Sequence, residues 1–123
     1  MFIDYFTPLH YASLNNCYQN ITSLLLSPKI DPNIGDNNGK TALHWAVIRG
    51  NYESVFELMK GSQIQINQQQ ENGMTALHYA ASNGFEKIIC LLIEYGAQKT
   101  IRDNDEFCFI KTILHSILQN DLV

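Results

Sequence analysis

Four histidines are the side chains of this chain best suited to acid–base or metal chemistry. His10, His44 and His78 are spaced 34 residues apart, and the fourth is His115. Because the first three occupy one position of a repeated segment, we expect them on successive stacked helices, whose axes are about 8–10 Å apart. The ligands of one zinc ion each lie about 2 Å from it, so neighbouring units cannot easily share a metal. We therefore expect a structural role for these three histidines.

Other reactive side chains do not select a chemistry either. The chain has no His-x-x-x-His pair, no Gly-x-Ser-x-Gly nucleophile elbow and no glycine-rich phosphate loop. Asp103, Asp105 and Glu106 are close enough in sequence to hold a hard cation, but an acidic loop of this kind is more often solvated. We predict no catalytic residue, no cofactor and no metal, and hence a protein that is not an enzyme.

The composition describes one domain with a buried core. The chain has 123 residues, of which 46% are hydrophobic and 16% charged, and this balance is typical of a globular fold. The longest apolar run, residues 88–93, is far shorter than the roughly 20 residues of a membrane helix. The net charge is −4 and no cluster of Lys or Arg is present. We therefore expect neither a membrane nor a nucleic acid as a partner.

The cysteines and the N-terminus favour an intracellular, cytoplasmic protein. Cys17, Cys90 and Cys108 are odd in number and far apart, which supports neither a disulfide framework nor a zinc site. The N-terminus has no basic flank and reaches its first motif at Thr7, which leaves no room for a secretory signal.

The histidines belong to a segment that occurs three times with a fixed period. Residues 7–12 are Thr-Pro-Leu-His-Tyr-Ala, residues 41–46 are Thr-Ala-Leu-His-Trp-Ala, and residues 75–80 are Thr-Ala-Leu-His-Tyr-Ala. A period in the low thirties marks a stacked array, in which each unit covers the apolar face that its neighbour cannot bury alone. The segment resembles the ankyrin repeat, whose signature is Thr-Pro-Leu-His-x-Ala, then Gly four residues on, then an apolar helix.

The residues after each signature support this resemblance. Gly50 and Gly84 occupy the expected glycine position, and the first copy has Asn16 there, a residue that also tolerates a left-handed backbone. In the first unit, Thr7 can cap a helix that has Pro8 in its first turn. A second helix over about residues 18–27 would be stopped by the proline that follows.

The resemblance implies stacked helical hairpins joined by β-hairpin-like finger loops. Residues 36–41, Asp-Asn-Asn-Gly-Lys-Thr, match the family's Asp-x-x-Gly-x-Thr finger, with Gly39 supplying a positive φ. The next finger keeps Gly73 but has Gln70 where the family has Asp. The expected core positions of the second and third units are Leu43, Ala46, Val47, Val55, Leu58, Met59, Leu77, Ala80, Ala81, Ile89, Leu92 and Ile93.

Beyond residue 102 the pattern decays and two registers compete. The family phase starts a finger at Asp103, but Glu106 replaces Gly and Cys108 replaces Thr, so this register has lost its turn residue. The other register takes residues 112–117, which recover Thr-x-Leu-His at a spacing of 37. Either register leaves one helix, with an apolar stripe made of Ile110, Ile113, Leu114, Ile117 and Leu118. We expect a half-repeat that closes the stack, or a chain cut from a longer protein.

The whole chain, residues 1–123, is thus expected to be one all-α repeat solenoid. Its repeats are expected at about residues 5–35, 36–69 and 70–102, with a partial one at 103–123. The resemblance implies a non-catalytic module that binds a protein partner through the concave face formed by the fingers and the first helices. By family phase, the positions of this face that are free to contact a partner are Leu14, Asn15, Asn37, Asn38, Lys40, Trp45, Ile48, Arg49, Glu71, Asn72, Met74, Tyr79, Ser82 and Asn83.

Two features of this surface leave alternatives open. Tyr11, Trp45 and Tyr79 recur at one position and form an aromatic column, which either contacts a partner or packs between helices. Residues 5–28 contain no Asp, Glu, Lys or Arg, although a terminal repeat normally has a polar outer face. This end is either an uncharged but adequate cap or is covered. We predict that at least one end of the stack is covered, by missing chain or by a second copy.

Two other functions fit the same sequence. The chain could be the repeat segment of a longer enzyme or of a bacterial effector, which would act in the host-cell cytosol. It could also be an autonomous inhibitor, similar to the small ankyrin inhibitors of cyclin-dependent kinases. A fold does not by itself identify a partner.

Overall fold

The computed structural model describes residues 5–61 and 63–108. These residues form six helices and contain no strand. The helices are α1 (Pro8–Leu14), α2 (Tyr18–Leu25), α3 (Ala42–Ile48), α4 (Tyr52–Met59), α5 (Ala76–Asn83) and α6 (Glu86–Glu94). The expected fourth-unit helix, the competing register at Thr112 and His115 lie outside the described residues.

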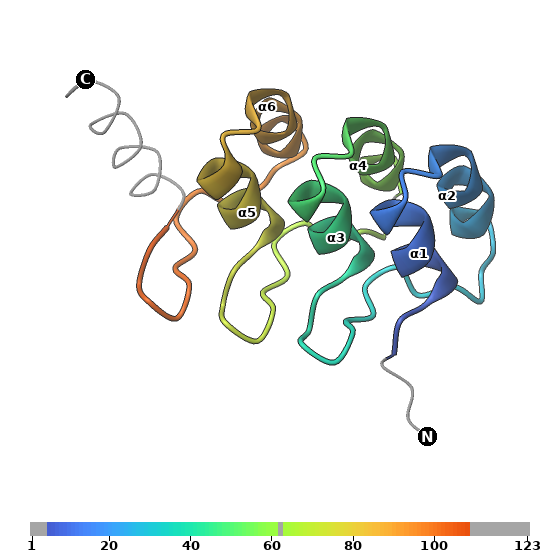
Figure 1. Cartoon of the computed structure of the whole chain (residues 1–123), viewed down its shortest axis with the longest axis horizontal. Coiled ribbons are helices and arrows are strands. Elements are labelled where there is room, and N and C mark those ends of the chain that lie inside the picture. The colour runs from blue at the N-terminus through green and yellow to red at the C-terminus, as the bar shows by residue number, and fades with distance from the viewer. Residues whose placement is uncertain (1–4, 62, 109–123) are drawn as a thin grey trace.

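The helices form two parallel rows with finger loops projecting from one side (Figure 1). The first row contains α1, α3 and α5, and the second contains α2, α4 and α6. Each helix packs against its hairpin partner and against its counterpart in the next unit. The stacked hairpins of an all-α solenoid are therefore the architecture of this chain.

Each first-row helix begins at the same Thr-x-x-His box. The hydroxyl of Thr41 accepts a hydrogen bond from the backbone N–H of His44, and the imidazole Nδ1 of His44 accepts one from the backbone N–H of Thr41 at 3.0 Å. Thr7 and Thr75 make the same pair of bonds with the histidines three residues on. A capping box normally uses Glu or Gln at this third position. Here histidine satisfies the otherwise unpaired donor, which fixes where these short helices start.

The turn between the two helices of each unit uses a left-handed residue, as predicted. The φ angles are 56° at Asn16, 69° at Gly50 and 68° at Gly84. A Cβ at Gly50 would lie 3.1 Å from the ring of Phe85, so this glycine also allows the next unit to approach closely.

Asn16, which stands where the next two units have glycine, also joins the first two units. Its Oδ1 accepts hydrogen bonds from the backbone N–H and the hydroxyl of Ser54, in the first turn of α4. In return, the amide of Asn51 donates to the carbonyls of Ser13 and Leu14 at the end of α1, at 2.9 and 3.1 Å. Each asparagine therefore satisfies helix-end groups of the neighbouring unit, which have no partner within their own helix.

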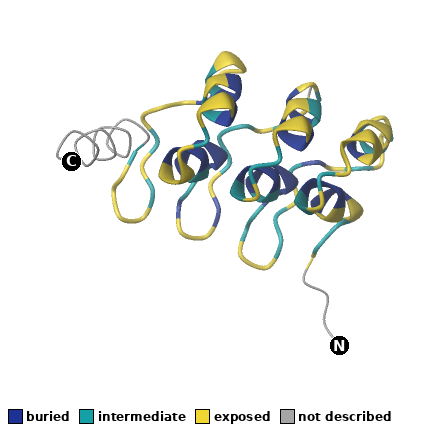
Figure 2. Ribbon diagram, turned by 45° about the horizontal axis from the view of Figure 1, so that its top comes forward, coloured by how far each residue is buried: buried dark blue, intermediate teal, exposed yellow. Residues whose placement is uncertain are grey.

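The buried side chains form one continuous core between the two rows (Figure 2). All the predicted core residues are buried except Ile89 and Ile93, which are only partly buried. Ile21 and Val55, which hold the position of Ile89 in the first two units, are fully buried. The prediction was wrong for Ile89 because, within the described residues, no further hairpin packs on this side of α6.

Candidate recognition surface

Each repeated histidine has the structural role predicted for it, because it bonds its helix to the finger of the next unit. The Nε2 atoms of these histidines each lie within hydrogen-bond distance of a backbone carbonyl oxygen. His10 lies 2.8 Å from that of Lys40, His44 lies 3.0 Å from that of Met74, and His78 lies 2.8 Å from that of Phe107. Since a carbonyl oxygen can only accept, Nε2 carries the proton, while Nδ1 accepts within the capping box. Both ring nitrogens are therefore used by the fold.

Burial favours the neutral form of two of these rings, those of His10 and His44. It lowers the pKa of His44 to about 4, although the hydrogen bond to Met74 opposes the shift. Burial also lowers the pKa of His10, against the hydrogen bond to Lys40 and the charge of Asp36. A neutral imidazole with both nitrogens occupied cannot act as a general base without breaking the fold, which supports the structural role.

The finger turn recurs three times with the same backbone bonds. In the first finger, the N–H of Asp36 donates to the carbonyl of Lys40 at 2.8 Å, and the N–H of Gly39 donates to the carbonyl of Asp36 at 2.9 Å. Residues 70–74 and 103–107 repeat both bonds. The finger at Asp103 therefore forms in the family-phase register.

The expectation that this register had lost its turn residue is wrong. Glu106 takes the left-handed conformation itself, with φ 66°, at a cost of about 1–2 kcal/mol for a residue with a side chain. The carboxylate of Asp103 accepts hydrogen bonds from the backbone N–H groups of Asp105 and Phe107 at 3.0 and 2.8 Å, and His78 holds the carbonyl of Phe107. These bonds impose the turn in the absence of glycine.

The aromatic column is partly structural. The indole of Trp45 donates to the carboxylate of Asp36 at 2.9 Å, and the hydroxyl of Tyr79 donates to the side-chain carbonyl of Gln70. Burial of Asp36 opposes its charge, but hydrogen bonds from Trp45 and from the finger backbone outweigh it and lower the pKa. The half-buried Trp45 and Tyr79 thus brace their own fingers, and Gln70 substitutes for the expected Asp as the acceptor.

Phe6, which no sequence pattern marked, joins Tyr11 and Trp45 in a cluster. Its ring stacks on His10 at 4.8 Å between centroids and meets the rings of Tyr11 and Trp45 edge-on at 4.7 and 5.9 Å. The ammonium of Lys40 lies 5.5 Å from the centroid of the Trp45 ring. Tyr11 is 58% exposed, so the cluster offers an aromatic surface beside a cation.

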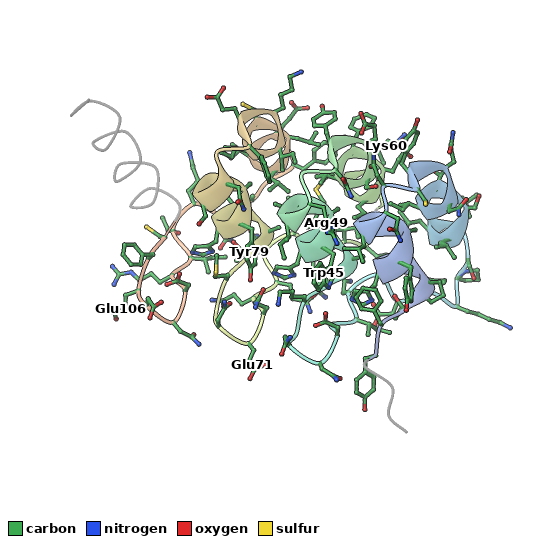
Figure 3. The ribbon with its side chains drawn as sticks, in the orientation of Figure 1. Trp45, Arg49, Lys60, Glu71, Tyr79 and Glu106 are labelled. Atoms are coloured by element: carbon green, nitrogen blue, oxygen red, sulfur yellow. The ribbon has the colours of Figure 1, made fainter. Side chains whose placement is uncertain are left out.

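None of the fourteen residues expected to contact a partner is buried. The exposed ones are Asn15, Asn37, Asn38, Arg49, Glu71, Asn72, Ser82 and Asn83, and the partly exposed ones are Leu14, Lys40, Trp45, Ile48, Met74 and Tyr79. We call these fourteen residues the finger row. Figure 3 shows Trp45, Arg49 and Tyr79 on the first helices above Glu71 on its finger, whereas Lys60 lies at the end of α4.

The fingers of this row are bonded to one another. The N–H of Glu71 donates to the carbonyl of Asn38 at 3.0 Å, and the N–H of Asn104 donates to the carbonyl of Asn72 at 2.9 Å. A groove of about 410 Å³ follows the first two fingers and is lined by Asn38, Lys40, Gln70, Glu71, Asn72 and Asn104. The fingers therefore form one polar platform beside the first helices.

The acidic segment does not form a metal site in the structure. Within residues 5–61 and 63–108, no three His, Cys, Asp or Glu side chains are placed to hold one ion. The carboxylate of Asp103 is instead engaged in its own turn.

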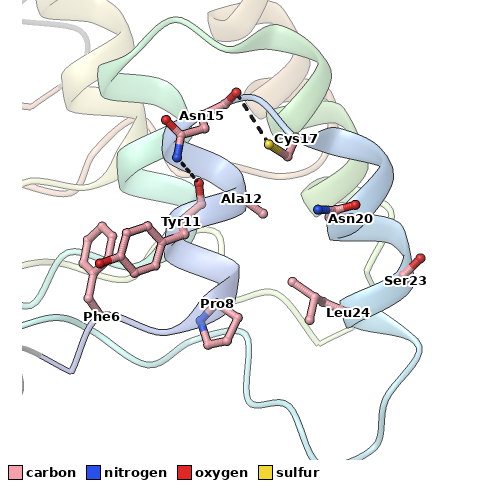
Figure 4. A pocket seen from close by; sticks show the side chains of 9 residues that line it. All are labelled: Phe6, Pro8, Tyr11, Ala12, Asn15, Cys17, Asn20, Ser23 and Leu24. Atoms are coloured by element: carbon pink, nitrogen blue, oxygen red, sulfur yellow. Dashed lines mark hydrogen bonds between the residues drawn. The ribbon is translucent and has the colours of Figure 1, made fainter.

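A second surface feature is an apolar groove of about 580 Å³ at the N-terminal end of the stack (Figure 4). Its lining includes Pro8, Asn20 and Leu24 from α1 and α2, and these side chains are exposed or only partly buried. The residues at the same positions of the next two units are buried, namely Ala42, Ser54, Leu58, Ala76, Ile88 and Leu92. The groove is therefore the surface that a preceding unit covers elsewhere in the stack.

Comparison with known proteins supports the internal repeat. A family model described as ankyrin repeats, in three copies, matches residues 9–103. No curated protein matches the chain. Across the described residues, the structure contains no helix of the length and apolarity that crossing a membrane requires. The matched range includes nearly all of the helical stack and its histidine-bonded fingers, and the chain belongs to the ankyrin repeat family.

Proposed function

We propose that this protein is a non-catalytic module that binds a protein partner through the finger row. Ankyrin repeats are generally protein–protein interaction modules. The observation that carries the choice of surface is that the side chains of Arg49, Glu71 and Ser82 are exposed and make no hydrogen bond or ion pair within the described residues. These side chains can contact a partner without breaking a hydrogen bond or an ion pair of the fold.

The outer surface of the second unit supports this choice by contrast. On α4, Glu53 accepts a hydrogen bond from Asn16, and Glu57 accepts one from Thr22 and pairs with Lys60 at 3.0 Å. These charged groups already serve contacts within the stack, whereas the side chains of Arg49 and Glu71 in the finger row make no hydrogen bond or ion pair in the described structure.

The same geometry supports a protein partner over a nucleic acid. Lys40 and Arg49 are the two cations among the fourteen residues of the finger row, and Glu71 lies beside them. Two cations give little of the phosphate neutralisation on which nucleic-acid binding depends. We also propose an intracellular location, which is supported by Cys17 and Cys90, two exposed cysteines that form no disulfide within the described residues.

The prediction that at least one end is covered gains support from the N-terminal groove. A second copy or further chain would cover Pro8 and Leu24 as preceding units cover their equivalents. Light scattering over a concentration range would detect a second copy as concentration-dependent association. A monomer at every concentration, from a gene that encodes nothing before Met1 or after Val123, would contradict the prediction.

The test of the proposed function is quantitative affinity capture with a matched pair of variants. Arg49→Ala removes an exposed cation from the end of α3, in the first row of helices, and Lys87→Ala removes one from α6, in the second row. Neither side chain has a partner in the described structure. We expect Arg49→Ala to weaken capture by at least about 1–2 kcal/mol, because interface energy concentrates in a few central residues. We expect Lys87→Ala to leave capture unchanged. If Lys87→Ala reduced capture and Arg49→Ala did not, the partner would bind the second row of helices.

A further inference from the structure

The finger row continues onto the third finger, residues 103–107, and the row extended in this way has opposite charges at its two ends. Lys40 and Arg49 lie at the first finger and α3, and neither forms an ion pair within the described residues. The nearby carboxylate of Asp36 forms no ion pair with them in the described structure; one of its oxygens accepts from the N–H groups of Asn38 and Lys40 and the other from Trp45. The first end therefore carries two unpaired cations.

Lys40 borders the aromatic cluster of Phe6, Tyr11 and Trp45, and Arg49 follows Trp45 by one helical turn. Exposed aromatic rings with an adjacent Arg are the residue types that dominate interface energies. A partner side chain that is aromatic or large and apolar would bury area against Tyr11, while an acidic neighbour in the partner would pair with Lys40 or Arg49. The chemistry of this end thus favours an acidic–apolar pair.

The opposite end of the row is acidic. The carboxylates of Asp105 and Glu106 are exposed and make no hydrogen bond or ion pair within the described residues, while that of Asp103 is used in the turn. Glu71 lies between the two ends on the second finger. A Lys or Arg of the partner is the complementary group for the third finger.

The residue type at position 106 keeps this acidic end open. A Cβ at Gly39 would lie 3.1 Å from the backbone of Glu71, and one at Gly73 would lie 2.7 Å from the backbone of Asn104. Each finger therefore needs glycine at this position for the next finger to pack on it. Glu106 has a side chain here, so a fourth finger could not stack in the same way, and within the described residues the platform ends at the third finger.

The spacing of the two ends fits a short extended segment. Stacked helices are about 8–10 Å apart, so the first and third fingers, two units apart, are separated by roughly 16–20 Å. An extended chain spans about 3.3 Å per residue, so five or six residues bridge this distance. Because the three fingers are bonded to one another, they offer one fixed platform along which such a segment can lie.

We propose that the finger row binds an extended peptide segment with an acidic residue beside an aromatic or large apolar residue at one end and a Lys or Arg about five or six residues away. The acidic end lies over Lys40, Arg49 and the aromatic cluster, and the basic end lies over Asp105 and Glu106. This inference rests on the proposed function, because it names the chemistry of the partner for the same surface.

The experiment is a display selection of random peptides of about twelve residues on the intact protein, followed by affinity measurements on the winners. We expect enrichment of the acidic–apolar pair at the stated spacing from Lys or Arg. The Lys40→Gln/Arg49→Gln variant should bind such a peptide at least about tenfold more weakly, and so should a peptide whose acidic residue is neutralised. Lys87→Gln, a matched neutralisation on α6, should not change the affinity.

A bulky substitution separates this inference from the proposed function. Ser82→Trp should block any ligand of the finger row, whatever its charge. Selected peptides that Ser82→Trp blocks but that lack the charge pattern would overturn the inference and leave the proposed function standing. Peptides that Ser82→Trp does not affect, or a selection without enrichment, would count against both.

Discussion

The three signature segments are alike where they are buried and different where they are exposed. The buried positions have Leu, His and Ala in all three copies, as in Leu43, His44 and Ala46. The exposed position at the end of the first helix changes from Asn15 to Arg49 to Asn83. Each unit must pack on the same kind of neighbour, so its interior repeats. No such constraint acts on the exposed side chains of the finger row, and we propose that these residues recognise a particular partner.

The largest expected effect comes from the interior. Leu43→Ala and Leu77→Ala should each lower the free energy of unfolding by about 2–5 kcal/mol, because both side chains are buried between neighbouring units. Urea unfolding measures this effect. Ser82→Ala is the control, since Ser82 is exposed and makes no hydrogen bond in the described structure. Gln69 is not a suitable control residue, because its side-chain amide donates hydrogen bonds to the carbonyl oxygens of Gly73 and Arg102. A leucine variant as stable as Ser82→Ala would contradict the interior role.

The next effect is a loss of stability in acid. Burial lowers the pKa of His44 from 6.5 to about 4, so between these values the unfolded chain binds a proton that the folded chain excludes. The stabilisation is therefore complete above about pH 6.5 and falls by up to about 3 kcal/mol as the pH drops towards 4. The lowered pKa of His10 acts in the same direction.

Urea unfolding at about pH 7.5 and pH 4.5 measures this difference. The His44→Gln variant is the comparison, because it retains every carboxylate but cannot titrate at this position. Its stability should change less between the two pH values than that of the wild type. An equal change in both proteins would contradict the assignment of a neutral, buried His44.

A smaller effect is expected at the junction of the first two units. Asn16→Ala should cost about 1–2 kcal/mol, because it removes the acceptor of Ser54 and places alanine in a left-handed conformation. Asn16→Gly removes the acceptor but relieves the backbone, so thermal melts should place it between Asn16→Ala and the wild type. If Asn16→Gly were less stable than Asn16→Ala, backbone strain at position 16 would not explain the loss of stability in Asn16→Ala.

The smallest effect should be a gain. Glu106→Gly should stabilise the fold by about 1 kcal/mol, since glycine adopts φ near +66° without strain. Glu106→Gln, which keeps the side chain but not its charge, separates strain from electrostatics and should leave the melting temperature nearly unchanged. A stabilisation by Glu106→Gln as large as that by Glu106→Gly would show that charge is the cause.

The sequence predicted the structural features that recur in every unit, but not those that depend on individual contacts. The capping threonines and the left-handed Asn16 follow from residue types at fixed positions, the structural role of the histidines follows from their spacing, and the structure confirms all three. The turn at Glu106 did not follow, because bonds made by Asp103 and His78 replace the preference of glycine. Phe6 was missed because the position before the signature is Lys40 and Met74 in the next two copies, so no periodic signal marks it.

The most direct test of the central claim, that the finger row binds a protein, is site-specific photo-crosslinking. A photoreactive amino acid in place of Ser82 lies in the row on α5, and one in place of Lys87 lies on α6; both positions are exposed and without a partner in the described structure. We expect position 82 to crosslink one protein, with the yield reduced by Arg49→Ala, and position 87 to crosslink none. Crosslinking from position 87 but not from position 82 would contradict the account.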